Sequence, residues 1–424
     1  MNHDNMKMTE IGWIPKDWEC KRLDGCSLIK ARIGWQGLTK SEYLPYGTYY
    51  LVGGTDFENG RVNWNTCSFV TKERFEQDKY IQIRNHDVLI SKDGTIGKVA
   101  YVNGFNGQGT LNSGVFVVRP KSKDIDQGYF AWTFLSMYFD DFISRLTAGS
   151  TIKHLYQKDL VNFLFPLPTK LSEQRRIAEV LSDTDSLIAS LSHTIEKKRL
   201  VKQGAMQQLL TGKTRLKGFS GDWVEKELGE CADIYRGGSP RPIESFITTL
   251  PDGLNWIKIG DVANNAKYIN KTAERIIPEG EKHSRFVRNG DLLLSNSMSF
   301  GRPYILRTDG CIHDGWLVIQ NYKDEWVTDF LYYLLCSENV LKQYEVLAAG
   351  SGVKNLNKAI VSNVVLRYPV DLNEQFAIAN ILTTMDNEIT SLEAELQKYK
   401  ALKQGMMQKL LTGEIRLRIC QTTE

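Results

Sequence analysis

Apolar residues recur at alternating steps of four and three positions in two long stretches of the chain. This spacing is a 3.5-residue repeat, the pattern of the seam between paired helices in a coiled coil. It predicts two long helices, and one of about 38 residues would be about 57 Å long. The apolar seam positions that we expect are Ile177, Leu181, Ile188, Leu191, Ile195 and Leu209 in the first stretch, and Ile378, Leu382, Met385, Ile389, Leu392, Leu396 and Leu410 in the second.

The two seams have equal length, which favours pairing between them over the alternative that each helix packs only on its own domain. Each helix follows a globular block, so antiparallel pairing would put the two blocks at opposite ends of a rod. Lys202 and Lys403 occupy matching seam positions. Because a charged residue weakens an apolar seam, these lysines indicate a place where another protein docks.

The two helical stretches are copies of one another. Residues 173–216 and 374–417 align at an offset of 201, with 21 of 44 positions identical. Upstream, fainter anchors also repeat, but the sequences between them differ almost completely. Because two copies are too few for a solenoid, we interpret the chain as an internal duplication, with variable blocks at 1–167 and 218–370 and nearly constant helical segments at 168–217 and 371–424.

The variable blocks have the sequence patterns of an α+β fold. Short β-branched stretches predict strands at Val115–Arg119, Asp87–Ile90 and Trp316–Gln320. Helical apolar spacing covers Tyr129–Phe142 and Asp329–Tyr344. The predicted architecture is therefore α+β, with two mixed domains joined by two long helices that form an antiparallel coiled coil.

Composition adds constraints on location and partners. The 424 residues include 42% hydrophobic residues, enough for packed cores, and contain no apolar run long enough to span a membrane. Seven scattered cysteines without a CxxC pair fit a reducing cytoplasm. The net charge of +3 does not by itself indicate a nucleic-acid binder. Segment 168–217 carries 10 basic and 5 acidic residues, against 6 and 8 in segment 371–424, which suits side-by-side pairing.

Motifs for catalysis are absent from the sequence. Gly212-Lys213-Thr214 resembles the end of a phosphate-binding loop, but Gln207 stands where that motif needs a glycine. The six histidines show no metal-ligand spacing. Asp87 and Asp291 recur in related strands, where we expect a structural turn role. The sequence therefore predicts neither a catalytic centre nor a metal site.

The chain twice repeats a variable block followed by a helix with the pattern Glu-Gln-x-x-Ile-Ala-x-x-Leu…Lys-Gln-Gly-x-Met-Gln-x-Leu-Leu-Thr-Gly-x-x-Arg-Leu. This order resembles the specificity (S) subunit of type I restriction–modification systems. The opening Ile14-Pro15-x-x-Trp18, the stretch Gly34–Gly37 and the string 87–98 resemble that family too. The resemblance implies that each variable block is a target-recognition domain reading one half of a bipartite site in double-stranded DNA. It also implies that the helices form an antiparallel spacer on which two methyltransferase (M) subunits dock.

In that family two restriction (R) subunits then join. The resemblance therefore implies a non-catalytic cytoplasmic subunit, with adenine methylation and DNA cleavage carried out by its partners. S-adenosylmethionine, ATP and Mg²⁺ are expected only on those partners. Phe376-Ala377 replaces Arg175-Arg176 in the second copy, so the two M-docking surfaces are expected to differ.

We expect the DNA contacts to come from basic and amide side chains near loops of both blocks. Because neither block is strongly basic, we expect this chain alone to bind DNA weakly. The glycine-rich stretch 236–241 is expected to bind an anion through its backbone amides. The candidates are Arg32, Trp35, Gln36, Lys92, Lys98 and Lys153 in the first block, and Arg236, Gly237, Ser239, Arg241, Asn296, Arg302 and Lys354 in the second.

Two other classes of protein compete with this interpretation. A coiled-coil scaffold or adaptor with two divergent ligand-binding domains and no DNA role would fit the near-neutral charge. An enzyme with its site in one variable block has no supporting motif. A salt-titrated DNA-binding assay separates these classes, because phosphate contacts make affinity fall steeply with salt.

Overall fold

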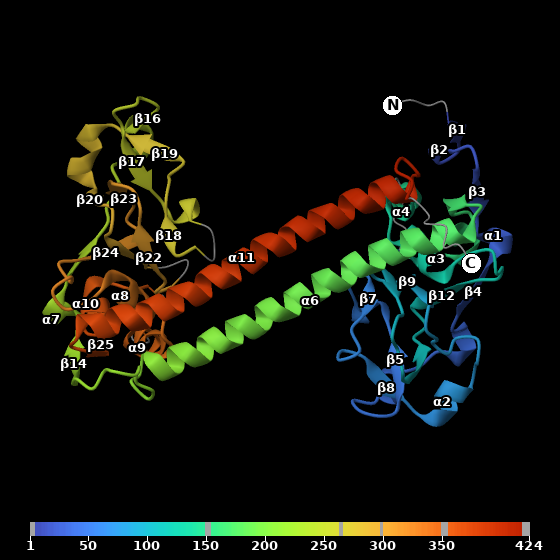
Figure 1. The fold of residues 1–424 in the computed structure, drawn as a ribbon, viewed down its shortest axis with the longest axis horizontal. Helices are drawn as coiled ribbons and strands as arrows, with labels where there is room; N and C mark the ends of the chain where they lie inside the picture. Colours follow the sequence, from blue (N-terminus) through green and yellow to red (C-terminus); the bar gives the residue numbers. More distant parts are fainter. Residues whose placement is uncertain (1–4, 149–153, 263–265, 297–299, 349–354, 418–424) are drawn as a thin grey trace. The chain divides into compact units, whose positions relative to one another are not determined.

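The computed structural model describes residues 5–148, 154–262, 266–296, 300–348 and 355–417, with the side chain of Trp35 also left out. The chain forms two compact units. Unit 1 comprises residues 1–191 and 395–424, and unit 2 comprises residues 192–394. Helices α6 (Leu171–Leu209) and α11 (Leu372–Leu411) each contribute to both units (Figure 1). Each unit thus combines one variable block with part of both helices.

The block of unit 1 is built on two small sheets with strand orders β10-β9-β12-β4 and β11-β5-β8. The first sheet is antiparallel, whereas β11 runs parallel to β5. Among the described residues of this unit, three further strand pairs are β1-β2, β6-β7 and β13-β3. The strands are β1 (Met6–Thr9), β2 (Gly12–Pro15), β3 (Trp18–Arg22), β4 (Ser27–Ala31), β5 (Tyr49–Val52), β6 (Phe57–Glu58), β7 (Arg61–Val62), β8 (Ser68–Val70), β9 (Val88–Ser91), β10 (Val99–Tyr101), β11 (Gln108–Leu111), β12 (Val115–Pro120) and β13 (Leu164–Pro168).

The block of unit 2 repeats this plan with larger sheets, in the orders β15-β24-β21-β22-β18 and β16-β19-β17-β23-β20, together with the pair β14-β25. The strands are β14 (Trp223–Glu227), β15 (Asp233–Arg236), β16 (Ile247–Thr248), β17 (Leu254–Ile257), β18 (Tyr268–Ile269), β19 (Glu274–Ile276), β20 (Arg285–Val287), β21 (Leu292–Ser295), β22 (Pro303–Leu306), β23 (Gly310–Ile312), β24 (Trp316–Gln320) and β25 (Val365–Pro369).

Short helices connect and cover these strands. In unit 1 they are α1 (Leu23–Cys26), α2 (Lys72–Glu76), α3 (Gln127–Phe134), α4 (Met137–Thr147) and α5 (Gln157–Leu160), with 3₁₀ turns η1 (Gly34–Gln36), η2 (Lys40–Glu42) and η3 (Gly54–Asp56). In unit 2 they are α7 (Leu228–Cys231), α8 (Thr328–Leu335), α9 (Glu338–Ala348) and α10 (Lys358–Ser362), with η4 (Ile243–Ser245), η5 (Ile259–Asp261) and η6 (Pro278–His283).

The three predicted strands are confirmed as β9, β12 and β24. Each predicted helix within a block is instead two helices, α3 with α4 and α8 with α9. The hydroxyl of Ser136 explains the first break, because it donates to the carbonyl of Thr133 and accepts from the amide of Tyr138 (2.7 and 3.3 Å). Such local bonding by serine favours a new helix start over continuation of the old helix.

The apolar faces of the long helices serve both the seam and the blocks. In unit 1, Ile177 and Leu181 of α6 share one buried cluster with Leu410 of α11 and Phe130 of α3. In unit 2, Ile378 and Leu382 of α11 share a cluster with Leu209 of α6. The other predicted seam positions are buried or half-buried. Pairing between helices and packing on the blocks therefore coexist.

Ion pairs show the direction of pairing within each unit. In unit 1, Glu173 of α6 meets Arg416, while Asp185, further along α6, meets Lys403, which comes earlier in the chain. In unit 2, Lys202 meets Asp386, and Arg215 meets Glu374. Rising numbers on one helix match falling numbers on the other, so the predicted antiparallel pairing is confirmed in each unit.

Candidate functional site

The repeated Glu-Gln at the start of each long helix forms a clamp with the repeated Arg-Leu beyond the end of the other helix. The carboxylate of Glu374, 1% exposed, accepts two hydrogen bonds from Arg215 (2.6 and 2.7 Å). The equivalent Glu173 pairs with Arg416 through both carboxylate oxygens, and Arg416 also bonds to both oxygens of Asp17 at 3.0 Å. The hydrogen bonds from Arg416 lower the pKa of Asp17. Each clamp holds a helix start against the far end of its partner.

The glutamine of the same motif fastens each helix to its own block. Gln375 donates to the carbonyls of Glu325 and Pro369 and accepts from the amide of Val327 (2.8, 2.9 and 2.9 Å). Gln174 makes the equivalent three bonds to Asp124, Pro168 and Asp126 in unit 1. Sequence reasoning missed both roles, although the identity of Glu-Gln in the two copies was a signal for them.

The two seam lysines are paired within the chain. Lys202 Nζ lies 2.5 Å from Asp386, and Lys403 Nζ lies 2.5 Å from Asp185. The two pairs are related by the 201-residue offset. Each lysine thus satisfies an aspartate across the seam.

Two of the DNA-contact candidates in the first block are buried. Arg32 is 2% exposed and donates to Leu111 O, Gln36 O, Gln77 Oε1 and Thr110 Oγ1. Gln36 is 5% exposed. In this conformation both side chains face the interior of the block, and Arg32 ties η1 to β11.

Other candidates lie on a turn between two strands or outside the described residues. The turn from β9 to β10 carries Lys92, which is half-buried with Nζ 5.5 Å from the centre of the Phe116 ring, and Lys98, which is exposed. The amide of Lys98 donates to Ser91 Oγ and holds the turn closed. Lys153, Lys354 and the side chain of Trp35 lie outside the described residues.

The loop at 236–241 does not form the expected anion site, because its own block uses its donors. The amides of Gly237 and Gly238 donate to the carbonyls of Trp316 and Ile312. Ser239 donates to a carboxylate oxygen of Asp314 (3.1 Å), and Arg236 Nε donates to its carbonyl (3.1 Å). Arg236 and Arg241 remain exposed cations at this edge.

The turn from β21 to β22 repeats the arrangement of Lys92 and Lys98. Asn296 is 2% exposed and donates to Asp314 O at 2.9 Å. Arg302 is half-buried, with its guanidinium 5.6 Å from the centre of the Tyr304 ring, and its amide donates to Ser295 Oγ. Arg302 therefore matches Lys98 in position, whereas Asn296 belongs to the interior.

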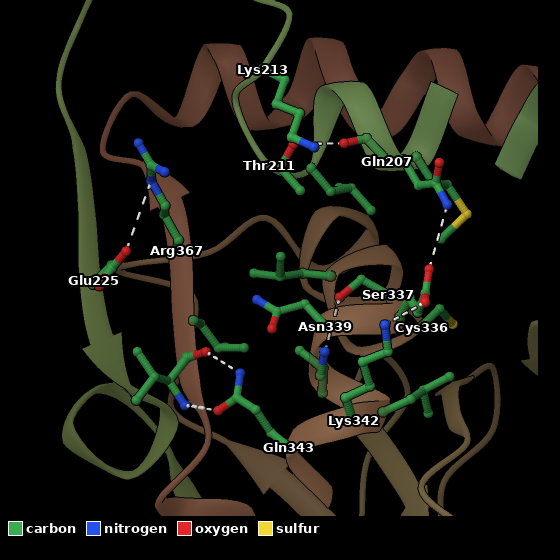
Figure 2. Close-up of a pocket in the computed structure, with 18 of the residues that line it drawn as sticks. Gln207, Thr211, Lys213, Glu225, Cys336, Ser337, Asn339, Lys342, Gln343 and Arg367 are labelled. Carbon is green, nitrogen blue, oxygen red and sulfur yellow. Dashed lines mark hydrogen bonds and ion pairs between the residues drawn. The ribbon is translucent and has the colours of Figure 1, made fainter. Parts of the chain in front are cut away.

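A groove of about 830 Å³ in unit 2 lies between the end of α6, the turn from α8 to α9, and β25 (Figure 2). Lys213 lines it, but the chain here follows a helix and turns at Gly212 with φ of +70°, so it is no phosphate-binding loop. Gln343 bonds to both backbone groups of Val365 at 2.9 Å. Several polar groups of the groove pair with one another, and the described residues that line it assemble no catalytic arrangement.

Other chemistry is limited in the part of the chain that the structure describes. No cluster of three His, Cys, Asp or Glu side chains there suits a metal ion. Asp87 is buried against Arg119 (2.6 Å), and Asp291 accepts from Gln320, so both have the structural role expected of them. Among these residues, no helix has the length and apolar character to cross a membrane.

Comparison with known proteins gives a consistent result. The family model described as type I restriction modification DNA specificity domain matches the chain twice, over residues 15–198 and 220–404. The chain is 26% identical to a putative type I restriction enzyme MjaX specificity subunit of Methanocaldococcus jannaschii, covering 98% of this chain and 97% of that one. It is 24% identical to the EcoBI specificity subunit of Escherichia coli, over 64% of this chain and 63% of that one.

Solved structures show the same fold. The S subunit of a type I restriction–modification system from M. genitalium matches with a TM-score of 0.62 at 15% identity, covering 97% of this chain and 98% of that one. A chain from a study of assembly and conformational transition of a type I system matches with a TM-score of 0.56 at 18% identity, covering 95% of this chain and 99% of that one.

Proposed function

Because the chain belongs to the type I restriction–modification DNA specificity family, we propose that it is the subunit that selects the DNA sequence for a methyltransferase and restriction complex. Each block reads one half of a bipartite site in double-stranded DNA. The observation that carries the proposal is the duplication itself, because two divergent blocks are each fastened to the helix pair by the same Glu-Gln and Arg-Leu contacts. Such a design keeps the frame constant while the sequences that are read differ.

The exposed or half-buried cations at the block edges are the proposed phosphate contacts. These are Lys92, Lys98, Arg236, Arg241 and Arg302. Phosphate contacts position a protein on DNA, whereas base contacts from nearby loops select the sequence. With a net charge of only +3 over the whole chain, M subunits are proposed to supply much of the remaining phosphate contact.

The long helices are the proposed docking surface for two M subunits, through which R subunits join. The surfaces of the two copies differ, because exposed Phe376 stands where exposed Arg175 stands in the first copy. S-adenosylmethionine, ATP and Mg²⁺ are proposed to bind to those partners, which carry out methylation and cleavage.

Methylome sequencing of cells with and without this chain tests the proposal. We expect a methylated bipartite motif that disappears when the chain is deleted. Purified complex with M subunits should shift a duplex carrying that motif, with affinity falling steeply as salt rises. An unchanged methylome together with no shift at any salt concentration would refute the proposal and favour an adaptor.

A further inference from the structure

Each unit has a polar node where a cation of the block reaches the helix pair. In unit 1, Arg61 of β7 lies 2.7 Å from Asp185 of α6, which also pairs with Lys403 of α11 at 2.5 Å. The Asp185 side chain is 17% exposed. Burial raises the pKa of Asp185, but hydrogen bonds from Lys403 and Arg61 outweigh burial and hold it below the ordinary value. One carboxylate thus joins the block, α6 and α11.

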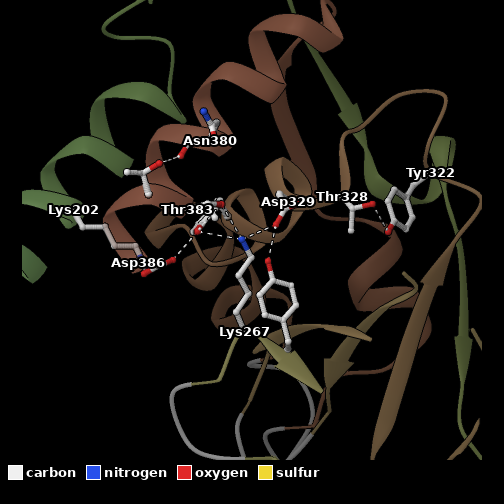
Figure 3. A network of polar contacts seen from close by, with 11 residues as sticks. Lys202, Lys267, Tyr322, Thr328, Asp329, Asn380, Thr383 and Asp386 are labelled. Carbon is white, nitrogen blue, oxygen red and sulfur yellow. Dashed lines mark hydrogen bonds and ion pairs between the residues drawn. The ribbon is translucent and has the colours of Figure 1, made fainter. Parts of the chain in front are cut away.

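Unit 2 builds its node with a lysine (Figure 3). Lys267, next to β18 and 10% exposed, lies 2.6 Å from Asp329 of α8 and 3.1 Å from Thr383 of α11. It also donates to the hydroxyl of Tyr333 at 3.2 Å. That hydroxyl donates to Asp386 at 2.6 Å, and Asp386 pairs with Lys202 of α6. The block, α8 and both long helices again meet at one place.

The helix side of the two nodes is the same device in two copies. The 201-residue offset relates Asp185 to Asp386 and Lys403 to Lys202. The same offset relates Trp132 to Tyr333, the aromatic residues next to the lysines. Lys403 lies 4.9 Å from the centre of the Trp132 ring, and Lys202 lies 5.5 Å from the centre of the Tyr333 ring. The block side is made by different residues, Arg61 and Lys267.

Both block cations lie beside corresponding strands of the two units, with Arg61 one residue further along the chain than the position that matches Lys267. The amide of Tyr101 in β10 donates to the carbonyl of Gly60, directly before Arg61. The amide of Ile305 in β22 donates to the carbonyl of Lys267. Strands β10 and β22 continue into the turns that carry Lys98 and Arg302. One backbone hydrogen bond and one short strand therefore link each node to a proposed DNA contact.

We propose that Arg61 and Lys267 are positioning residues that fix the angle of each block against its helix pair. They thereby restrict the complex to one separation between the two DNA half-sites. This inference rests on the proposed function. Buried ion pairs select one arrangement over its alternatives in some proteins, even where replacing them by apolar residues leaves stability unchanged. The nodes are proposed to act in this way, on which spacing is accepted.

The test compares DNA duplexes that differ only in the distance between the half-sites. The full chain with its M subunits is titrated with duplexes that carry the motif identified by methylome sequencing. The spacer between the half-sites has its natural length or is one base pair shorter or longer. Arg61→Met and Lys267→Met remove the node cations, and Arg61→Gln and Lys267→Gln are polar alternatives should the first pair fold poorly. Lys72→Met removes an exposed lysine of α2 and is the matched control.

We expect the wild type and the Lys72→Met variant to prefer the natural spacing strongly. In the node variants, the ratio of affinities for the natural and the altered spacing should fall about tenfold, because these variants tolerate a second block angle. Their affinity for the natural duplex should stay similar. Arg61→Lys, which keeps the charge, should restore part of the preference. Folded variants with an unchanged preference, or with equal losses on all three duplexes, would overturn the inference. A wild-type complex that binds no duplex would overturn the proposed function and this inference with it.

Discussion

The two end clamps provide a sensitive test of how this chain holds its helices together. In Glu374→Gln, the side chain keeps its shape but loses the charge that faces Arg215. In Glu173→Gln, the same change is made in unit 1, where Arg416 keeps Asp17 as a second carboxylate. The chain thus contains its own matched control for a single lost charge.

The expected magnitudes follow from burial. Removing one partner of a fully buried ion pair costs about 3–5 kcal/mol, whereas an exposed pair contributes about 0.2–1 kcal/mol. Glu374 is 1% exposed and Arg215 is 28% exposed, so the pair lies between these limits. We therefore expect Glu374→Gln to lower the free energy of unfolding of unit 2 by about 2–3 kcal/mol. Because Asp17 still neutralises Arg416, Glu173→Gln should cost unit 1 only about 1–2 kcal/mol.

Hydrogen exchange followed by mass spectrometry gives the free energy of opening for each unit separately, which global unfolding of a chain with two units does not. The peptides to compare are those at the start of α11 and the start of α6. Equal losses in the two variants would refute the reasoning that Asp17 supports Arg416. A loss below about 0.5 kcal/mol for Glu374→Gln would show that the clamp contributes no more than an exposed pair.

Three further predictions concern single positions. The pKa of Asp185 is lowered in the folded state, so its stabilising effect is present above its ordinary pKa and is lost as pH falls through the folded value. Between about pH 5 and pH 3 the wild type should therefore lose more stability in unit 1 than Asp185→Asn, as measured by pH-dependent hydrogen exchange. Parallel losses in the two proteins would contradict this. Gln375→Leu leaves the carbonyls of Glu325 and Pro369 and the amide of Val327 without their partner, and should cost about 3 kcal/mol or more in urea unfolding. A cost below about 1 kcal/mol would show that water replaces the glutamine. Gly405 lies inside α11 with nothing within 4 Å of an added Cβ, so Gly405→Ala should stabilise the protein by about 0.5–1 kcal/mol in thermal unfolding. Gly413 has a φ of +72° and an added Cβ would meet Pro15, so Gly413→Ala should destabilise the protein. The opposite signs would refute the packing described for both glycines.

The sequence by itself determined the two long helices and their duplication. A 3.5-residue repeat needs no tertiary information, because it follows from local helix geometry. The equal lengths of the two seams favoured pairing between the helices, and the resemblance to the specificity subunits implied that this pairing is antiparallel. The strands at β9, β12 and β24 were also readable, because short β-branched runs are local signals.

Only the tertiary structure decided which charged and amide residues face solvent. Arg32 is buried because β11, distant in sequence, brings Leu111 and Thr110 around its guanidinium. Lys202 gains its partner from Asp386, 184 residues away. Such contacts depend on the path of the chain between the two residues, which periodicity and composition do not encode. For the same reason Arg61 and Lys267 had no signal in the sequence. They lie in segments that differ between the copies, and only backbone hydrogen bonds to β10 and β22, made by Gly60 and by Lys267 itself, bring them beside corresponding strands.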